Sequence, residues 1–174
     1  MAYCRALNGE GNRRIKRYVQ SGGAYLGLCA GGYYGSSRCE FEVGKGREME
    51  VVGDRELAFF PGVCRGLAFP GFVYNSEAGA RAVELVVDKE GLGEGKWDVE
   101  GRFRSYYNGG GVFVDAGKFK DKGVDVLATF ADGLAVEGGE DGAAVVYCKV
   151  GDGKVVLTGP HPEYAQCTLS SLLH

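Results

Sequence analysis

The chain has 174 residues, a formal net charge of −3 and a pI near 5.5, which fits one domain over residues 1–174 and argues against nucleic acid as a partner. Its start, Met1–Arg5, lacks the apolar core of a signal peptide, and no apolar run approaches the ~20 residues that a membrane span needs. We therefore expect a cytoplasmic protein without a membrane partner, whose six cysteines are free thiols. None of the six forms a C-x-x-C pair, so neither a metal nor a cofactor is predicted.

The first expected elements are a helix, a strand and a second helix. Glu10–Gln20 carries apolar residues at helical spacing and is followed by Gly22-Gly23, which is typical of a helix end. An apolar strand is expected over Ala24–Leu28. The sequence then predicts a short helix that starts within Tyr33–Ser37.

The rest of the chain is predicted to be mainly β. A hairpin is expected from Cys39–Val43 and Met49–Val52, which flank Gly44-Lys45-Gly46. Glycine makes up 31 of the 174 residues, and its placement between apolar runs indicates many tight turns. Asp152-Gly153 is expected to be a two-residue turn, and Tyr164–Leu173 a final helix. The remaining strands are expected at Leu57–Phe60, Val83–Asp88, Gly101–Tyr107, Val112–Asp115, Val124–Phe130, Ala143–Lys149 and Lys154–Thr158.

The most informative motif is Gly27-Leu28-Cys29-Ala30-Gly31-Gly32, which lies between the first strand and the second helix. This is the layout of a nucleophile elbow, a sharp turn that exposes a nucleophile and needs small residues two positions to either side. Gly27 and Gly31 supply them here. Because unsatisfied N–H groups create a positive field at a helix N-terminus, we expect Cys29 to favour its thiolate.

A candidate base lies near the other end of the chain, in Pro160-His161-Pro162-Glu163. The chain has two histidines, and His161 is a better candidate partner for Cys29 than the C-terminal His174. The prolines favour an extended backbone, in which residues i and i+2 face the same side. Glu163 is therefore expected to orient the imidazole ring and to stabilise its charged form, as the third member of a catalytic triad does.

Each of these motifs also has a structural interpretation. Gly-rich turns after strands are common, cysteines are often buried, and a histidine between prolines is often a loop residue. The order strand–Cys–helix, then strand–His-x-Glu, favours a nucleophile because it is the expected context of the motif. Asn75, Glu77 and Tyr106-Tyr107-Asn108 are candidates to line a pocket beside Cys29, although turn chemistry and strand packing explain them as well.

The two motifs together resemble those of class I glutamine amidotransferase-like domains, whose Cys-His-Glu triad uses a G-x-C-x-G elbow and a late H-P-E. More narrowly, the chain resembles the amidotransferase-like N-terminal domain of fungal biotin–protein ligases. The stretches that carry this resemblance are Gly27–Gly35, Cys39–Phe41, Phe59–Gly62, Tyr74–Arg81, Tyr107–Gly111 and Leu157–Glu163. The resemblance implies an α/β, flavodoxin-like sheet flanked by helices, with added β-hairpins. It places Cys29, His161 and Glu163 at the triad positions, and the backbone N–H groups of Ala30 and Gly31 at an oxyanion hole.

Two departures from the family modify these expectations. The biotinylating domain is absent, so the chain by itself is not expected to biotinylate anything. The family has strands before the first helix that end in a Pro-Gly-Gly loop, whereas this chain begins at Met1-Ala2-Tyr3. That loop supplies one oxyanion-hole N–H, and losing one such donor typically costs ~10²–10³ in rate. Ala24–Leu28 is then expected to be a sheet edge, covered by the N-terminal segment or by a second copy in a homodimer.

Three functions are open at this point. The first is an enzyme in which Cys29 attacks a small-molecule amide or acyl substrate and forms a thioester, as in glutamine hydrolysis. The second is a non-catalytic binding or regulatory module that keeps the triad residues as a relic, which the absent strands favour. The third is a redox-sensing thiol, since exposed cysteines of low pKa oxidise readily.

Overall fold

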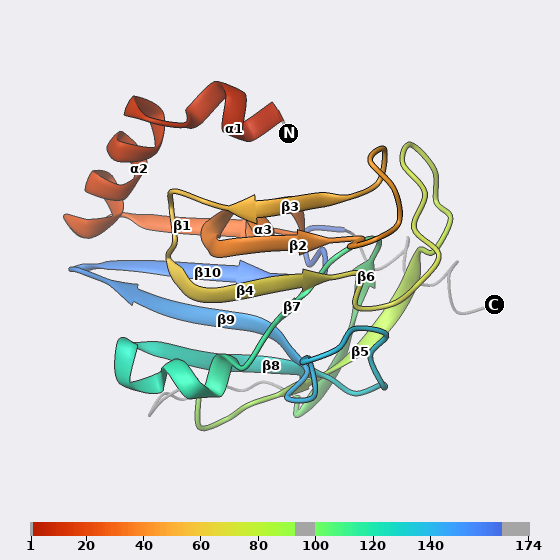
Figure 1. The fold of residues 1–174 in the computed structure, drawn as a ribbon. Coiled ribbons are helices and arrows are strands. Elements are labelled where there is room, and N and C mark those ends of the chain that lie inside the picture. The colour runs from red at the N-terminus through yellow and green to blue at the C-terminus, as the bar shows by residue number, and fades with distance from the viewer. Residues whose placement is uncertain (1, 93–99, 165–174) are drawn as a thin grey trace.

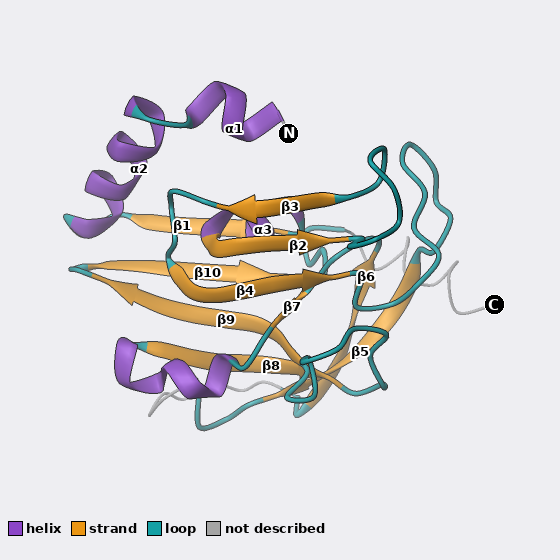
Figure 2. Cartoon of the chain, viewed as in Figure 1, coloured by secondary structure: helices purple, strands orange, loops and turns teal. Residues whose placement is uncertain are grey.

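The computed structural model describes residues 2–92 and 100–164, which form two mixed β-sheets accompanied by short helices (Figures 1 and 2). The helical elements are α1 (Ala2–Leu7), α2 (Glu10–Gln20), α3 (Ala30–Gly35) and the 3-10 helix η1 (Ala116–Lys122). The strands are β1 (Ala24–Leu28), β2 (Ser36–Phe41), β3 (Val51–Asp54), β4 (Phe60–Gly66), β5 (Arg81–Val87), β6 (Arg102–Tyr107), β7 (Val112–Phe113), β8 (Val124–Phe130), β9 (Ala143–Val150) and β10 (Gly153–Thr158).

The larger sheet has six strands in the order β1-β10-β9-β8-β5-β6. Among the described strands of this sheet, β1 and β10 run parallel and the other neighbours run antiparallel. The sheet curls, and β5 and β6 run steeply across the direction of the other strands in Figure 1. Tyr106 near the end of β6 forms an antiparallel bridge with His161, which lies beyond the end of β10. The curl therefore brings an edge strand of the sheet to the segment that follows β10.

The smaller sheet has the order β3-β2-β4-β7 and shares its core with the larger one. Phe60 of β4 and Phe113 of β7 meet edge to face with ring centroids 5.3 Å apart. Both are fully buried in the same cluster as Val155 and Leu157 of β10. Helix α3 contacts β1 and β10 of one sheet and β2 and β4 of the other. The turn before α3 is thereby held between two layers of packed side chains.

Much of the expected secondary structure is confirmed. Helix α2 and strand β1 have the predicted bounds, Glu10–Gln20 and Ala24–Leu28. Strands β5, β6, β8, β9 and β10 agree with the expected ranges to within two residues at each end. The expected sheet edge is present as well, because β1 is the end strand of the six-stranded order among the described residues. Apolar periodicity was sufficient for these elements because each packs one face on the core.

Several boundaries differ from the expectation. The second helix begins at Ala30, immediately after Cys29, and Ser36 already starts β2. Strands β2 and β3 do pair antiparallel as a hairpin, but β3 covers Val51–Asp54 and the connection takes up residues 42–50. The strand expected at Leu57–Phe60 instead starts at Phe60 and runs through Pro61 to Gly66, where it pairs in parallel with β2 and, at Cys64 and Arg65, antiparallel with β7.

Two turns are also placed differently. Val150 pairs with Gly153, so the two turn residues are Gly151-Asp152, with Gly151 at φ 60°. The strand expected at Val112–Asp115 stops at Phe113 because Asp115 adopts a left-handed conformation, with φ 54°, that starts η1.

The sequence reasoning missed α1 and η1. The final helix expected at Tyr164–Leu173 lies, after Tyr164, outside the described residues.

The class of the fold is α/β with mixed sheets, one of them curled. The flavodoxin-like sheet implied by the resemblance is a parallel one. Here the parallel pairs among the described strands are β1–β10 and β2–β4, and antiparallel pairs make up the rest of both sheets. Within the described residues, the structure has no helix that is both long enough and apolar enough to cross a membrane.

Candidate functional site

Cys29 lies where the carboxyl ends of two parallel strands meet. Leu28 of β1 is paired with Thr158 of β10, and the Cys29 N–H donates to the Thr158 carbonyl oxygen at 2.8 Å. Helix α3 begins at the next residue, which makes Cys29 its N-cap. Cys29 has φ 46° and ψ −101°, a backbone conformation that residues with a side chain rarely adopt. The predicted strand–Cys–helix turn is therefore present in a strained form.

Close packing around this turn explains part of its glycine content. A Cβ at Gly27 would stand 2.6 Å from the Gly31 carbonyl oxygen, and one at Gly32 would stand 2.8 Å from the Thr158 oxygen. Gly27 is thus needed, as the elbow motif predicts. At Gly31 a Cβ would have the Tyr25 hydroxyl as its neighbour, at 3.9 Å, so that position has room. The second essential glycine is Gly32, one residue later than the motif suggests.

His161 and Glu163 form the expected pair. His161 Nδ1 and Glu163 Oε1 are 2.7 Å apart. The backbone N–H of His161 donates to the Tyr106 carbonyl oxygen at 2.7 Å, which ties this loop to the end of β6. Tyr164 stacks on Tyr106 with ring centroids 4.4 Å apart, and its ring meets His161 edge to face. The side chains of His161 and Glu163 remain 21% and 41% exposed, so the pair borders solvent.

The thiol of Cys29 faces a different partner. Its Sγ lies 3.8 Å from the Asn108 carbonyl oxygen, and within the described part of the chain His161 is not among its hydrogen-bond partners. Burial raises the pKa of Cys29 to about 11, which the Ala30 N–H opposes and the Glu163 carboxylate reinforces. The expected preference for thiolate is therefore wrong for this resting arrangement. Desolvation of the thiol exceeds the effect of the helix N-terminus.

The predicted pocket residues have separate roles. Asn108 lies beside Cys29, and its Nδ2 donates to the Ser76 carbonyl oxygen at 3.2 Å. Tyr107 is fully buried and donates to the Gly110 carbonyl oxygen at 2.8 Å, which gives it a packing role. Asn75 and Glu77 are exposed, and Glu77 accepts a hydrogen bond from the Tyr106 hydroxyl. Of these five candidates, the structure brings Asn108 to the candidate nucleophile.

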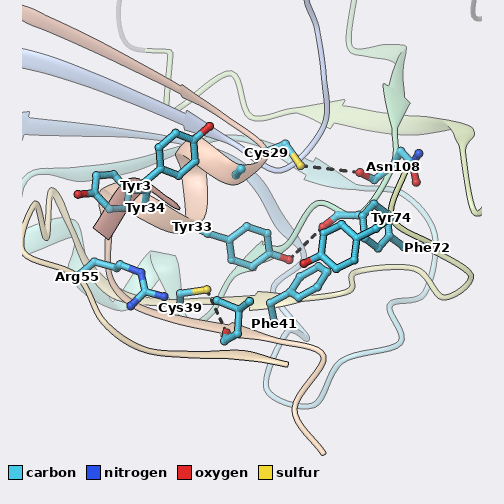
Figure 3. A pocket seen from close by; sticks show the side chains of 13 residues that line it. Tyr3, Cys29, Tyr33, Tyr34, Cys39, Phe41, Arg55, Phe72, Tyr74 and Asn108 are labelled. Atoms are coloured by element: carbon cyan, nitrogen blue, oxygen red, sulfur yellow. Dashed lines mark hydrogen bonds between the residues drawn. The ribbon is translucent and has the colours of Figure 1, made fainter. Parts of the chain in front are cut away.

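A cavity of about 170 Å³ lies next to Cys29, and its walls are mainly apolar (Figure 3). It is lined by Tyr3, Cys29, Ala30, Tyr33, Tyr34, Cys39, Phe41, Val51, Arg55, Phe72, Tyr74, Asn108 and Gly109. Sequence reasoning missed most of this set because the residues come from α1, α3, two strands of the smaller sheet and several loops that are distant in sequence. The aromatic residues Tyr33-Tyr34, Phe41 and Phe72 were visible in the sequence, but no local pattern brings them together.

The remaining chemistry of the site is limited. Cys29, Cys39, Cys64 and Cys148 are free thiols, and the last three are buried. Burial raises the pKa of Cys39 to about 11, and that of Cys148 to about 12. Within residues 2–92 and 100–164, no group of three His, Cys, Asp or Glu side chains is arranged to hold a metal ion.

The fold and the site thus define an α/β protein with a strained cysteine turn beside a His-Glu pair. Residues 1–173 match the family described as "Biotin-protein ligase, N terminal", and the chain belongs to that family. It is 43% identical over 165 residues to a biotin–protein ligase of Schizosaccharomyces pombe, covering 95% of this chain and 24% of that protein. It is 35% identical over 163 residues to an uncharacterized protein of Chlamydia muridarum, covering 93% of this chain and 56% of the relative.

The chain therefore spans about a quarter and about half of the lengths of these two relatives. Among solved structures, it is similar to the β-galactosidase of Rahnella sp. R3, with a TM-score of 0.41, 14% identity and coverage of 94% of this chain and 20% of that one. The β-galactosidase of Bacillus circulans sp. alkalophilus gives a TM-score of 0.43, 12% identity and the same coverages. At these scores the two structures carry no inference about function.

Proposed function

We propose that this chain is a glutamine amidotransferase-like domain of flavodoxin-like ancestry that cleaves a small-molecule amide or acyl compound through a thioester on Cys29. The observation that carries this function is the strained, positive-φ backbone of Cys29 at the junction of β1 and α3. A conformation of this kind costs on the order of 1–3 kcal/mol and persists where the surrounding structure imposes it, often at functional sites. We infer that the close packing at Gly27 and Gly32, where a Cβ would clash with backbone oxygens, imposes it here.

The roles of the other residues follow from the hydrogen bonds at the site. A carboxylate only accepts, so the 2.7 Å contact with Glu163 places a proton on His161 Nδ1 and leaves Nε2 as the basic nitrogen. In the proposed reaction Nε2 takes the thiol proton as sulfur attacks the carbonyl carbon. The same proton then goes to the leaving nitrogen, and water hydrolyses the thioester to the carboxylic acid. The Ala30 and Gly31 N–H groups at the start of α3 are the proposed donors to the developing oxyanion.

The resting state requires one further step before this chemistry. Cys29 is protonated at neutral pH, because burial raises its pKa to about 11, and its thiol faces the Asn108 carbonyl. We therefore propose that substrate binding turns the thiol from Asn108 towards His161. Catalytic hydrogen bonds are often long or misaligned before substrate binds, so this geometry is compatible with a Cys-His pair.

The same observations favour a second candidate, a binding module without catalysis. A neutral thiol and an adjoining apolar cavity are sufficient to hold a ligand without reacting with it. The ligation activity in the name of the Schizosaccharomyces relative belongs to that protein, of which this chain matches 24%. For this chain we propose neither biotinylation nor a bound cofactor.

Intact-protein mass spectrometry during incubation with p-nitrophenyl esters and with glutamine separates the two candidates. The catalytic candidate predicts an acyl adduct on the wild-type chain, none on Cys29→Ala, and slower acylation of His161→Ala. Glu163→Gln, which keeps the shape but not the charge of the His161 partner, is expected to reduce the rate less than His161→Ala does. Cys148→Ala serves as the control because Cys148 is buried in the core. Equal acylation of wild type and Cys29→Ala, or none of either, supports the binding module instead.

A further inference from the structure

The cavity beside Cys29 contains a charged group that the proposed chemistry does not use. Arg55 follows the end of β3 and is 9% exposed. Its side chain lines the cavity together with Cys39 and Tyr34, as Figure 3 shows. The guanidinium is always ionised in proteins, so burial cannot be relieved by loss of its proton. A permanent positive charge therefore stands at the wall of a small apolar space.

This charge has no acidic partner within the described residues. Arg55 Nη1 donates to the carbonyl oxygens of Gly53 and Asp54, at 2.9 and 2.8 Å. Its Nε is buried and has no hydrogen-bond partner among the described residues. An unsatisfied buried donor typically costs about 1–3 kcal/mol, and more when it is charged. The stability of the fold therefore gives little reason for a buried arginine at this position.

The carboxylates next to Arg55 in sequence are engaged elsewhere. Asp54 Oδ1 accepts from Arg38 at 2.9 Å and its side chain is 85% exposed. Glu56 Oε2 accepts from the Gly9 N–H at 2.7 Å and from Asn12 Nδ2 at 2.8 Å. The Cys39 thiol borders the guanidinium, whose charge lowers the pKa of Cys39 against the larger effect of burial, and Nε is left without a hydrogen-bond partner among the described residues.

The geometry of the remaining donors and the size of the cavity restrict the ligand that fits here. Nη1 is occupied by carbonyls and Nε has no described partner, so we expect a ligand acceptor at Nε, and a carboxylate oxygen suits this donor because it forms a charge-assisted hydrogen bond with a guanidinium. An apolar cavity of ~150 Å³ accommodates benzene, so about 170 Å³ suits a ligand of roughly six to ten non-hydrogen atoms. The walls offer Tyr33, Phe41 and Phe72 for its apolar part.

We propose that this cavity binds a small monocarboxylate, whose carboxylate pairs with Arg55 and whose apolar body lies against the aromatic side chains towards Cys29. Tyr3 and Tyr74, which are 49% and 47% exposed, form the rim through which it enters. Binding of such a ligand does not require that Cys29 react. Where the ligand is also the substrate of Cys29, the inference rests on the proposed function and assigns its substrate to amide or acyl compounds that carry one carboxylate away from the reacting carbonyl.

The test compares charged and neutral ligands of equal shape. Benzoate and hexanoate are titrated at pH 7 into the full chain, followed by protein NMR shifts, and their uncharged counterparts benzamide and hexanamide are titrated in parallel. A charged hydrogen bond is worth about 1.5–3 kcal/mol, so each carboxylate should bind at least about tenfold more tightly than its amide. Equal affinities of the acid and the amide would overturn the inference.

Two arginine variants locate the charge. Arg55→Met should weaken benzoate binding at least about tenfold, while Arg102→Met, which removes a side chain 62% exposed on β6, should leave it unchanged. Because Met fills much of the space and removes a buried charge without a partner, Arg55→Met should melt at or above the wild-type temperature. If it does not fold, Arg55→Lys keeps the charge without the planar fork and should still lower the affinity for benzoate. Unchanged affinity in a folded Arg55 variant refutes the site.

The Cys29→Ser variant separates this inference from the proposed function. Serine replaces the thiol with a hydroxyl of similar shape, so benzoate binding should persist in Cys29→Ser. Carboxylate binding without acylation of the wild-type chain would leave the binding site standing and reject the thioester chemistry. Acylation of Cys29 without any preference for carboxylates would support the thioester chemistry and reject the carboxylate-binding site.

Discussion

Gly32→Ala is the substitution that most directly tests how the strained turn is held. A Cβ on Gly32 would stand 2.8 Å from the Thr158 carbonyl oxygen and 3.4 Å from Phe113 Cζ. Ordinary contact begins near 3.4 Å, so α3 or β10 has to move by about 0.6 Å. Overpacking of this kind costs about 1–3 kcal/mol. The better helix propensity of Ala offsets about 1 kcal/mol of that cost.

Gly31→Ala is the matched control, because it makes the same chemical change one residue earlier in α3. Its Cβ would have the Tyr25 hydroxyl as nearest neighbour, at 3.9 Å, so the propensity gain of up to about 1 kcal/mol should appear without a clash. The difference between the two variants removes the propensity contribution and is expected to be about 1–3 kcal/mol.

Thermal and urea unfolding followed by circular dichroism measure this difference. In a chain of this size, 1 kcal/mol shifts the melting temperature by about 2–4 °C, so Gly32→Ala should melt clearly below Gly31→Ala. The Cys29 N–H is bonded to the same Thr158 oxygen, so Gly32→Ala should also change the rate of Cys29 alkylation. Equal stability of the two variants would show that α3 is not in close contact with β10 and that packing does not impose the Cys29 conformation.

Further predictions concern the thiols, the core and the edge of the larger sheet. Since burial raises the pKa of Cys29 from 9.0 to about 11, its iodoacetamide rate in the ligand-free chain should keep rising from pH 9 to about 11; a plateau near pH 9 would show an ordinary thiol. Peptide mapping at neutral pH should find Cys29 alkylated before the buried Cys39, Cys64 and Cys148, and the reverse order would mean that the site is closed. Leu157→Ala, at a fully buried position, should lower the free energy of unfolding by about 2–5 kcal/mol in urea titrations, and a loss below 1 kcal/mol would contradict the packing of β10. Because β1 is an end strand among the described residues and Leu26 on it is 64% exposed, we expect a homodimer, and light scattering that reports a monomer at every concentration would exclude it.

The sequence alone determined the elements whose pattern is local. Alternating or helical spacing of apolar residues was enough for α2, β1 and β8, because each element buries one face. The elbow and the H-P-E segment were visible for a similar reason: each is a contiguous motif. The Glu163–His161 contact followed from extended geometry, since residues two apart in an extended segment face the same side.

Only the tertiary structure decided how these parts meet. The pairing of β1 with β10 brings Cys29 and the His161 segment to one edge, although 132 positions separate them in the chain, and no local pattern specifies that register. The state of the Cys29 thiol is likewise non-local, because the buried site around it is built from α1, α3, the smaller sheet and loops that are distant in sequence. Arg55 reads in the sequence as an ordinary charge after a strand. It becomes a candidate ligand-binding group because folding buries its Nε without a described partner, and burial depends on the packing of segments that are distant in sequence.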